Sequence, residues 1–244
     1  MSAEERRLPS SEAGRKIIIA IDGPAGAGKS TIARHLARHF GLLNLETGAM
    51  YRAFALKALR DELPLDDAAA LEQLAGETSI SLDPGEEENR VVLDGEDVTG
   101  LIRNPTVTDA ASRVSTFPAI RTWMVRLQQQ LGAKGGVVME GRDIGTVVFP
   151  HAEVKIFLDA APEARGQRRY EQMGRQGHPL VPPPEEIIRE LHARDERDRN
   201  RADSPLKPAP DSVLLDSTDM TLEQAVSAAE AIVESKLRGA KPAK

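Results

Sequence analysis

The chain has 244 residues and a formal charge of −6 at pH 7, which suits one α/β core with insertions and argues against a general nucleic-acid binder. It contains no cysteine, which excludes disulfides, thiolate zinc sites and a cysteine nucleophile. The polar N-terminus lacks the apolar run of a signal peptide, and no apolar segment approaches membrane-spanning length. We therefore expect a cytoplasmic protein with disordered ends at residues 1–14 and 239–244.

Residues 16–41 hold the strongest local pattern of the chain, a strand, a glycine-rich turn and a helix. The apolar run at residues 17–21 is short and β-branched, which predicts a buried parallel strand. The turn at residues 23–30 fits the pattern glycine, any four residues, glycine, lysine, serine or threonine. Apolar residues then recur every four positions up to Phe40, and Gly41 occupies the place of a left-handed helix cap. The motif therefore stands in the strand–turn–helix context of a phosphate-binding loop.

Each residue type in this turn has a reason in phosphate chemistry. Gly23, Gly26 and Gly28 leave room for backbone N–H groups to converge on a polyphosphate. The following helix directs its positive dipole end at the phosphates, and Lys29 adds a full charge. The Ser30 hydroxyl can bind Mg²⁺. The alternative interpretation is a glycine turn that only joins a strand to a helix.

The next segment predicts one more strand and two helices. A strand at residues 42–45 leads into a helix expected over residues 50–60. A short helix at residues 67–75 has Asp66 as its expected N-cap and Gly76 as its stop.

Residues 79–98 change character, because short alternating runs are separated by acidic and glycine-containing turns, and we expect a small hairpin-rich insertion. Proline opens each of two further helices, expected over residues 105–115 and 118–132. Trp123 lies one residue off the apolar stripe of the second helix, which favours packing over cofactor stacking for its ring.

The second half of the chain alternates strands with helices. Strands are expected at residues 137–139, 154–158 and 213–215. A helix starting at residue 162, a loop at residues 174–184 and a polar helix ending near residue 201 lie between them. A capping box formed by Thr221 and Gln224 opens the last helix.

Five short apolar strands that alternate with helices predict an α/β fold, with a five-stranded parallel sheet covered by helices on both faces. Ligands of such sheets bind beyond the carboxyl ends of the strands. Thr47, Arg142 and Asp143 follow strands, as the glycine-rich turn does, so we expect all of them to share one cleft.

Arginines on the two helices around the loop at residues 174–184 give a second signal. The two groups are Arg194, Arg197 and Arg201 with Asp198 beside them, and Arg165, Arg168 and Arg169. Interspersed acidic residues make a solvated helix with ion pairs the alternative interpretation. Beside a phosphate-binding loop we favour cationic groups placed over a migrating phosphoryl group, because arginine forks match phosphate oxygens.

Several polar residues near element ends stay open to two interpretations. Glu140 can hold the water shell of Mg²⁺ or be an ordinary carboxylate at the end of a strand. Asp143 can act on a ligand or pair with its neighbour Arg142. Arg52 and Arg121, each near an element end, are candidates of the same kind. None of the five histidines shows metal-ligand spacing to another, and we expect each of them to be solvated.

The chain resembles the bacterial cytidylate kinases over nearly its whole length. The segments that carry the resemblance are IDGPAGAGKST, ETGAMYR, LDGEDVTGLIR, SRVSTFPAIR, EGRDIGTVVFPHAEVKIFLDA, RDERDRNRADSPL and LLDST. The glycine-rich loop alone indicates only a nucleotide, whereas its conjunction with TGAMYR, GRDIGTVVFP and RDERDRNRA is highly specific. The resemblance implies a P-loop NTPase-type fold and phosphoryl transfer from ATP to CMP or dCMP, with Mg²⁺ as the cofactor.

The resemblance also assigns site residues by position. ATP would be held by Gly23, Pro24, Ala25, Gly26, Ala27, Gly28, Lys29, Ser30 and Thr31. CMP would be surrounded by Thr47, Arg52, Ser112, Arg121, Arg142, Asp143, Arg194 and Asp198. The catalytic charges would be Lys29, Arg142, Arg168 and Arg201, and Mg²⁺ would be held by Ser30, with Glu140 acting through water. Glu46 and Glu140 stand where aspartate is usual in the family, so the longer side chain changes the reach toward the metal shell.

A division of the chain follows from the same resemblance. The core would comprise residues 15–50, 105–160 and 202–238, with a nucleotide-binding insertion at residues 51–104 and a lid with the arginine-rich helix at residues 161–201. The expected partners are ATP and CMP or dCMP, with no nucleic acid and no membrane, and the expected state is a monomer.

Two other functions stay open at this point. A P-loop kinase for UMP, AMP or a small alcohol would share most of these features. A nucleotide-dependent switch of the GTPase kind would carry an Asn-Lys-x-Asp motif, which this sequence does not contain, and a nucleic-acid motor would be expected to add a basic tract.

Overall fold

A computed structural model of the chain describes residues 17–83, 85, 89–175 and 181–239. Its centre is a five-stranded sheet in the order β2-β6-β1-β7-β8, in which all neighbouring strands are parallel. The strands are β1 (Ile18–Asp22), β2 (Leu43–Glu46), β6 (Val137–Gly141), β7 (Val154–Asp159) and β8 (Val213–Asp216). The predicted α/β fold with a five-stranded parallel sheet is confirmed.

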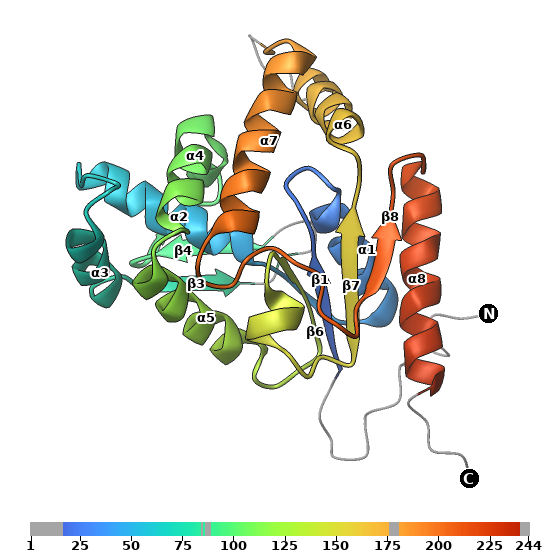
Figure 1. The fold of residues 1–244 in the computed structure, drawn as a ribbon. Coiled ribbons are helices and arrows are strands. Elements are labelled where there is room, and N and C mark those ends of the chain that lie inside the picture. The colour runs from blue at the N-terminus through green and yellow to red at the C-terminus, as the bar shows by residue number, and fades with distance from the viewer. Residues whose placement is uncertain (1–16, 84, 86–88, 176–180, 240–244) are drawn as a thin grey trace.

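The two faces of the sheet bury alternate residues of each strand, as the period of a strand requires. Ile19 and Ile21 of β1 pack with α1 (Lys29–Phe40) and α8 (Leu222–Gly239) on one face. Ile18 and Ala20 pack on the other face, where most of the remaining helices lie (Figure 1). Both faces are covered, which explains why the strand is apolar throughout.

The second face is covered by helices and by a small antiparallel sheet. The helices are α2 (Thr47–Arg60), α3 (Ala68–Gly76), α4 (Pro105–Val114) and α5 (Pro118–Gly132), and the three strands are β3 (Ile80–Asp83), β4 (Arg90–Leu93) and β5 (Glu96–Asp97). A 3₁₀ turn at Leu101–Arg103 and a π-helical turn at Ile144–Val148 complete this side. The predicted hairpin-rich insertion is therefore present as β3-β4-β5, and it shares one hydrophobic cluster with α2, α4 and α5.

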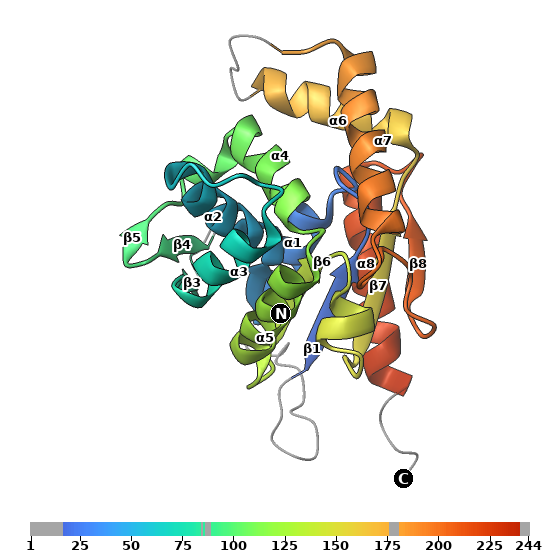
Figure 2. The same ribbon diagram turned by 60° about the vertical axis from the view of Figure 1, so that its left-hand side comes forward.

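Two helices, α6 (Pro162–Arg175) and α7 (Pro184–Asn200), pack on each other and project beyond the carboxyl ends of the strands (Figure 1). In the turned view they stand opposite the group formed by α2, α4 and β3-β5 (Figure 2). The loop between β1 and α1 lies below α6 and beside α7 (Figure 2). The edge of the sheet where ligands bind in such folds is thus bordered by both groups.

Several boundaries differ from those expected from the sequence. Helix α2 begins at Thr47 rather than at residue 50. The N-cap of α3 is Asp67 and not Asp66, because the Asp67 carboxylate accepts the N–H groups of Ala69 and Ala70 at 3.1 and 3.0 Å. Gly76 is the last residue of that helix and not its cap.

One strand is also longer than the apolar run that predicted it, because its backbone pairing with the neighbouring strand continues for two more residues. Glu140 and Gly141 belong to β6, because their backbones continue the pairing opposite Ile21 and Asp22 of β1. Helix α6 runs on to Arg175, inside the loop expected at residues 174–184, and residues 176–180 of that loop lie outside the described residues. The terminal tails expected at residues 1–14 and 239–244 also lie outside the described residues, except for Gly239.

Two predicted local contacts are confirmed. The capping box of α8 is present, with the Thr221 N–H donating to Gln224 Oε1 at 2.8 Å and the Gln224 N–H donating to Thr221 Oγ1 at 3.2 Å. The Trp123 ring packs on Phe54, with 5.2 Å between the ring centroids, so it belongs to the core.

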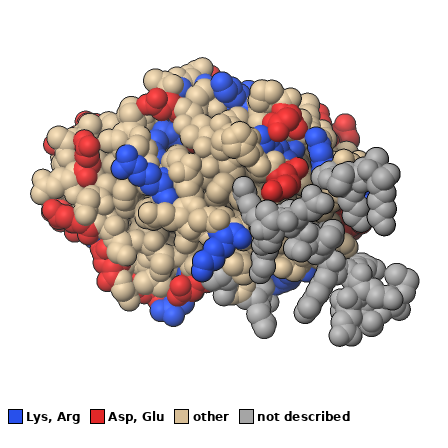
Figure 3. Space-filling model, turned by 90° about the horizontal axis from the view of Figure 1, so that it is seen from below, with Lys and Arg blue, Asp and Glu red and all other residues tan. Residues whose placement is uncertain are grey.

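The surface carries both charges. Seen from below, Lys and Arg side chains are interspersed with Asp and Glu over the part of that face that grey atoms leave visible (Figure 3). Among helices of the described ranges, none is both long enough and apolar enough to cross a membrane.

Candidate active site

The glycine-rich loop after β1 has the backbone that its sequence predicts. Gly23 has a φ of 151°, and a Cβ built there would lie 1.9 Å from the carbonyl oxygen of Leu158, so only glycine fits. Gly28 has a φ of 95° and is the N-cap of α1, which begins with Lys29. The first turn of α1 therefore offers its N–H groups at the carboxyl edge of the sheet, as an anion site requires.

Lys29 is buried and folded back onto its own loop, where its Nζ donates to the Pro24 carbonyl at 2.7 Å. Burial, assisted by the positive charge of Arg142, lowers the pKa of Lys29 to about 7, and Glu140 opposes the shift. A buried ammonium with so little compensation is stabilised by any anion that enters the loop.

Ser30 and Glu140 meet although they lie far apart in the sequence, because β1 and β6 are neighbours in the sheet. The Ser30 hydroxyl donates to Glu140 Oε1 at 2.6 Å. Burial raises the pKa of Glu140, and the charge of Lys29 opposes the shift. Glu46 lies opposite Glu140 in the register of β2 and β6, so two carboxylates approach this point. A hydroxyl and carboxylate oxygens are hard ligands, and this set fits Mg²⁺.

A second cluster of charges lies beyond β6, under the end of α7. Arg121 of α5 forms a buried ion pair with Asp143, and Arg142 Nε donates to Asp198 Oδ2 at 2.7 Å. Arg201 approaches both carboxylates, with 3.6 Å to Asp198 and 4.0 Å to Asp143. A pair between Asp143 and Arg142, left open from the sequence, is therefore wrong, because each takes a partner from another helix.

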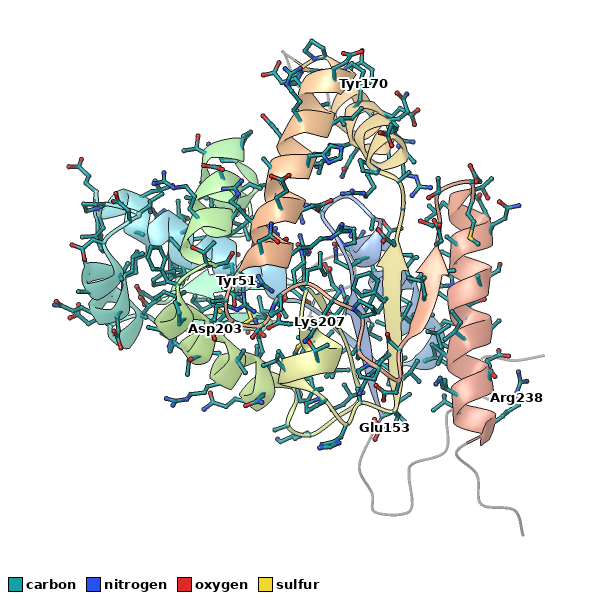
Figure 4. All side chains as sticks on the ribbon, viewed as in Figure 1. Tyr51, Glu153, Tyr170, Asp203, Lys207 and Arg238 are labelled. Carbon is teal, nitrogen blue, oxygen red and sulfur yellow. The ribbon has the colours of Figure 1, made fainter. Side chains whose placement is uncertain are left out.

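This cluster keeps polar atoms that no part of the described chain satisfies. Buried atoms without a hydrogen-bond partner there include Ser112 Oγ, Tyr51 Oη, Arg121 Nε, Arg194 Nε and Arg201 Nη2. Figure 4 places Tyr51 by the lower end of α7, and its ring lies 5.9 Å from the Arg121 guanidinium carbon. Buried polar groups are normally paired, so a group of unpaired ones at a ligand edge indicates a polar ligand.

Cationic groups crowd the space between the loop and this cluster. Burial, followed by repulsion from Arg142, lowers the pKa of Arg194 to about 10. Burial and then the charge of Arg52 lower the pKa of Arg169 on α6. Because these cations raise one another's free energy, the space between them favours anions.

Thr47 and Arg52 come from the start of α2. Thr47 Oγ1 donates to the Glu140 carbonyl at 2.8 Å, which joins α2 to β6. Arg52 Nη2 donates to Glu46 Oε1 at 2.5 Å, and its Nε is buried without a partner among the described residues. Both residues therefore lie at the edge where the loop and the charge cluster meet.

One predicted residue lies elsewhere. Arg168 of α6 donates to Ser217 Oγ at 3.1 Å and to the carbonyls of Ser217, Thr218 and Met220, in the turn that follows β8. These contacts hold Arg168 apart from the charge cluster.

One residue with a clear role, Asp22, escaped the sequence analysis. Asp22 ends β1 and accepts the N–H groups of Ile144 and Gly145, both at 2.7 Å, which fixes the turn after Asp143. Burial raises the pKa of Asp22 to about 7, although these two hydrogen bonds oppose the shift.

Arg165 of α6, which sequence alone placed in a solvated or phosphate-facing group, is buried. It donates to the Ala25 carbonyl at 2.9 Å and to Asp195 Oδ2 of α7 at 2.6 Å. It therefore joins the base of the helix pair to the glycine-rich loop. The sequence of α6 does not predict this contact, because a buried arginine cannot be distinguished from an exposed one by residue type alone.

The expectation that every histidine is solvated and has no ligand spacing is also wrong. His35 and His39 lie four residues apart on α1, which puts both on one face, and both contact Glu230 of α8.

Comparison with known proteins agrees with this geometry. A model of the cytidylate kinase family matches residues 19–235. A cytidylate kinase of Solibacter usitatus is 48% identical, over 91% of this chain and 94% of its own length. One of Pelotomaculum thermopropionicum is 51% identical, over 85% of this chain and 92% of its own. One of Pasteurella multocida is 44% identical, over 91% of this chain and 97% of its own.

Proposed function

The chain belongs to the cytidylate kinase family, and we infer from this premise that it is an ATP-dependent kinase that phosphorylates CMP. We propose dCMP as a second acceptor. The observation that carries the proposal is the pairing of two sites at one edge of the sheet. One is a glycine loop with a buried lysine, and the other is a cluster of arginines and carboxylates with unpaired polar atoms.

The glycine loop is the proposed ATP site, over residues 23–31. Its N–H groups and the start of α1 receive the phosphates, and Lys29 leaves the Pro24 carbonyl to meet them. The Lys29 charge then stabilises the negative charge on the transferring group, where the barrier is largely electrostatic.

The charge cluster is the proposed CMP site. An oxygen of the CMP phosphate attacks the γ-phosphorus of ATP, and the bond to the bridging oxygen breaks so that ADP leaves. The attacking phosphate has a second pKa of about 6 and is already ionised, so no general base is required. The two phosphates carry like charge and repel each other. The positive charges of Arg142, Arg194 and Arg201 would offset this repulsion and align them.

The proposed contacts of the cytosine base are Ser112, Arg121 and Asp143, which are all buried. A carboxylate accepts from the 4-amino group of cytosine and repels the 4-carbonyl of uracil. Arg121 Nε is unpaired and can donate to N3 of cytosine, which is an acceptor, whereas N3 of uracil is protonated.

Magnesium is the proposed cofactor, held by Ser30 and, through water, by Glu140. The ion would neutralise charge on the β- and γ-phosphates when bound. The Ser30 hydroxyl keeps its oxygen lone pairs while it donates to Glu140, so it can offer one of them to the ion. Burial raises the pKa of Glu140, and a cation beside it would favour the ionised carboxylate.

Helices α6 and α7 are the proposed lid. Closing it on both nucleotides would exclude water from the transferring group and bring Arg168 off the turn after β8. Hydrogen exchange of peptides from α6 and the first turns of α7 should slow with ATP analogue and CMP together and much less with either alone. Equal exchange in all states would contradict a lid.

The function itself is tested with an acceptor panel. ADP formation from ATP is measured with CMP, dCMP, UMP, AMP and small alcohols, and without acceptor. CMP-dependent turnover supports the proposal, and preference for another acceptor indicates a different P-loop kinase. ATP hydrolysis that ignores the acceptor would indicate a switch or motor. The division at residues 51–104 and 161–201, the monomeric state and the cytoplasmic location stay predictions, as does the lack of nucleic-acid and membrane partners.

A further inference from the structure

A cluster of metal-binding side chains lies where α1 packs on α8, on the face of the sheet away from α2–α5 (Figure 1). His35 and His39 point from the second half of α1 toward Glu230 of α8. His35 Nε2 lies 2.7 Å from Glu230 Oε1, and His39 Nδ1 lies 2.8 Å from the same oxygen. The three ligand atoms all lie within 4.8 Å of one another, so they converge on one point.

We propose that His35, His39 and Glu230 bind a divalent transition-metal ion, with zinc as the best fit. Two imidazole nitrogens and one carboxylate form a common zinc ligand set, and imidazole also suits nickel, cobalt and copper. Magnesium prefers a shell of oxygen ligands, so the ion required for phosphoryl transfer would not compete well here. The proposed metal site is independent of the proposed kinase reaction.

The two nitrogen–oxygen separations need only a small adjustment to accept the ion, and the two imidazole nitrogens, which lie within 4.8 Å of each other, must also reach tetrahedral spacing. Zinc–ligand bonds of about 2.0–2.1 Å in a tetrahedron separate neighbouring ligand atoms by about 3.3 Å. The present separations of 2.7 and 2.8 Å therefore widen by about half an ångström, which side-chain rotation can supply. The exposed fractions of the side chains are 43% for His35, 21% for His39 and 25% for Glu230, so water can reach the fourth position.

The metal would join the first helix of the chain to the last. Residue 39 lies about 15 Å along the α1 axis from residue 29, at 1.5 Å per residue, so the ion would not touch the phosphates. Binding to the folded chain alone stabilises it by mass action. We therefore expect a change in thermal stability and no change in turnover.

The competing explanation is a hydrogen-bonded trio without metal, in which both rings donate to one carboxylate oxygen. The two explanations make opposite predictions for added zinc. The full chain is stripped with a chelator, dialysed, and titrated with Zn²⁺ in competition with a chromophoric chelator. One ion per chain should bind, and a hundredfold excess over Kd should raise Tm by about 5–10 °C. Co²⁺ should give the visible absorption bands of tetrahedral coordination.

Variants identify the ligands. His39→Ala and Glu230→Ala should weaken zinc binding by at least about tenfold and cut the rise in Tm at the same zinc concentration by about half or more, whereas Glu230→His should keep both. His151→Ala and His192→Ala, outside the cluster, are the matched controls and should bind as wild type does. His35→Ala removes the most exposed ligand and serves if another variant fails to fold.

Two results would overturn the proposal. If the wild-type protein binds no zinc and its Tm does not rise, the three side chains form only the hydrogen-bonded trio. Cluster variants that bind zinc as tightly as wild type would place the ion elsewhere.

Discussion

The two parts of the proposed active site are built in different ways. The proposed ATP site is one continuous stretch, residues 23–31, whose shape comes from its own backbone. The proposed CMP site gathers side chains from α2, α4, α5, the turn after β6 and the end of α7. The first site needs only local conformation, whereas the second exists only after the whole chain has folded.

The difference extends to how each site holds charge. In the loop, a single buried lysine faces backbone dipoles and is poorly compensated. In the cluster, Arg121, Arg142 and Arg201 alternate with Asp143 and Asp198, so each charge has a partner before any ligand arrives. Loss of one charge should therefore stop chemistry in the loop, whereas in the cluster it should shift selectivity and alignment.

The largest effect is expected at Lys29. Lys29→Ala should lower kcat by about 10³-fold, because the only full positive charge of the loop leaves the transferring group. Initial rates with saturating ATP and CMP measure it, and Lys207→Ala, an exposed lysine in the loop before β8, is the control. A folded Lys29→Ala protein with near wild-type turnover would mean that this loop does not hold the phosphates.

The next effect concerns the choice of base. Asp143→Asn supplies an N–H that suits the uracil carbonyl, so CMP activity should fall. A site that hydrogen-bonds one group can reject its analogue by about 10⁴, and the CMP-to-UMP ratio of kcat/KM should narrow by about 10²-fold. Steady-state kinetics with both acceptors measure the ratio.

Asp198→Asn is the matched control, because Asp198 pairs with Arg142 rather than facing the base end. It should lower activity and leave the ratio near the wild-type value. An unchanged ratio in Asp143→Asn would show that Asp143 only holds Arg121 in place.

The sequence predicts more of the loop than of the cluster, because the loop is local and the cluster is assembled from distant elements. The loop is a fixed spacing of glycines, lysine and serine, so its conformation follows from local chemistry, and Gly23, Gly26 and Gly28 all have positive φ. The sheet and most helices follow from apolar periodicity. Ser112 carries no local signal and was reached only through the resemblance, whereas the spacing of the arginines on the helix before residue 201 drew attention to Asp198.

Side-chain contacts between residues far apart in the sequence could not be predicted from the sequence. Nothing local marks Arg165 as buried against Ala25, or Asp22 as the acceptor that fixes the turn after β6. Which arginine pairs with which aspartate depends on how α5 and α7 approach β6, so neighbours in sequence such as Arg142 and Asp143 turn to different helices.

Arg201 in the cluster and Arg168 on α6 of the proposed lid are expected to contribute differently to the rate. Arg201→Ala should lower kcat by about 10²-fold with a smaller change in the KM for CMP, because its charge is needed most during transfer. Arg168→Ala should cost only about tenfold, since Arg168 is held by the turn after β8 in this structure. Arg201→Lys should recover part of the rate. Equal losses for Arg168→Ala and Arg201→Ala would place both at the phosphates.

The smallest effect tests the poorly compensated charge of the loop. With a pKa of about 7, about half of the Lys29 side chains are neutral at pH 7 in the ligand-free protein. ATP phosphates favour the ammonium, so binding should take up a proton and raise this pKa. Between about pH 7 and pH 8 the protonated fraction falls from about one half to one tenth, so the Kd for ATP should weaken about fivefold.

Calorimetry in two buffers of different ionisation enthalpy measures both the Kd and the proton uptake. Asp22 has a pKa in the same range, and an arriving anion would also favour its protonated form, so Asp22→Asn separates its share. Lys29→Met keeps the titration of Asp22 and of ATP itself and should lose most of the dependence. If the wild-type Kd is equal at both pH values and no proton is taken up, Lys29 is already charged before ATP binds, and the loop is compensated as fully as the cluster.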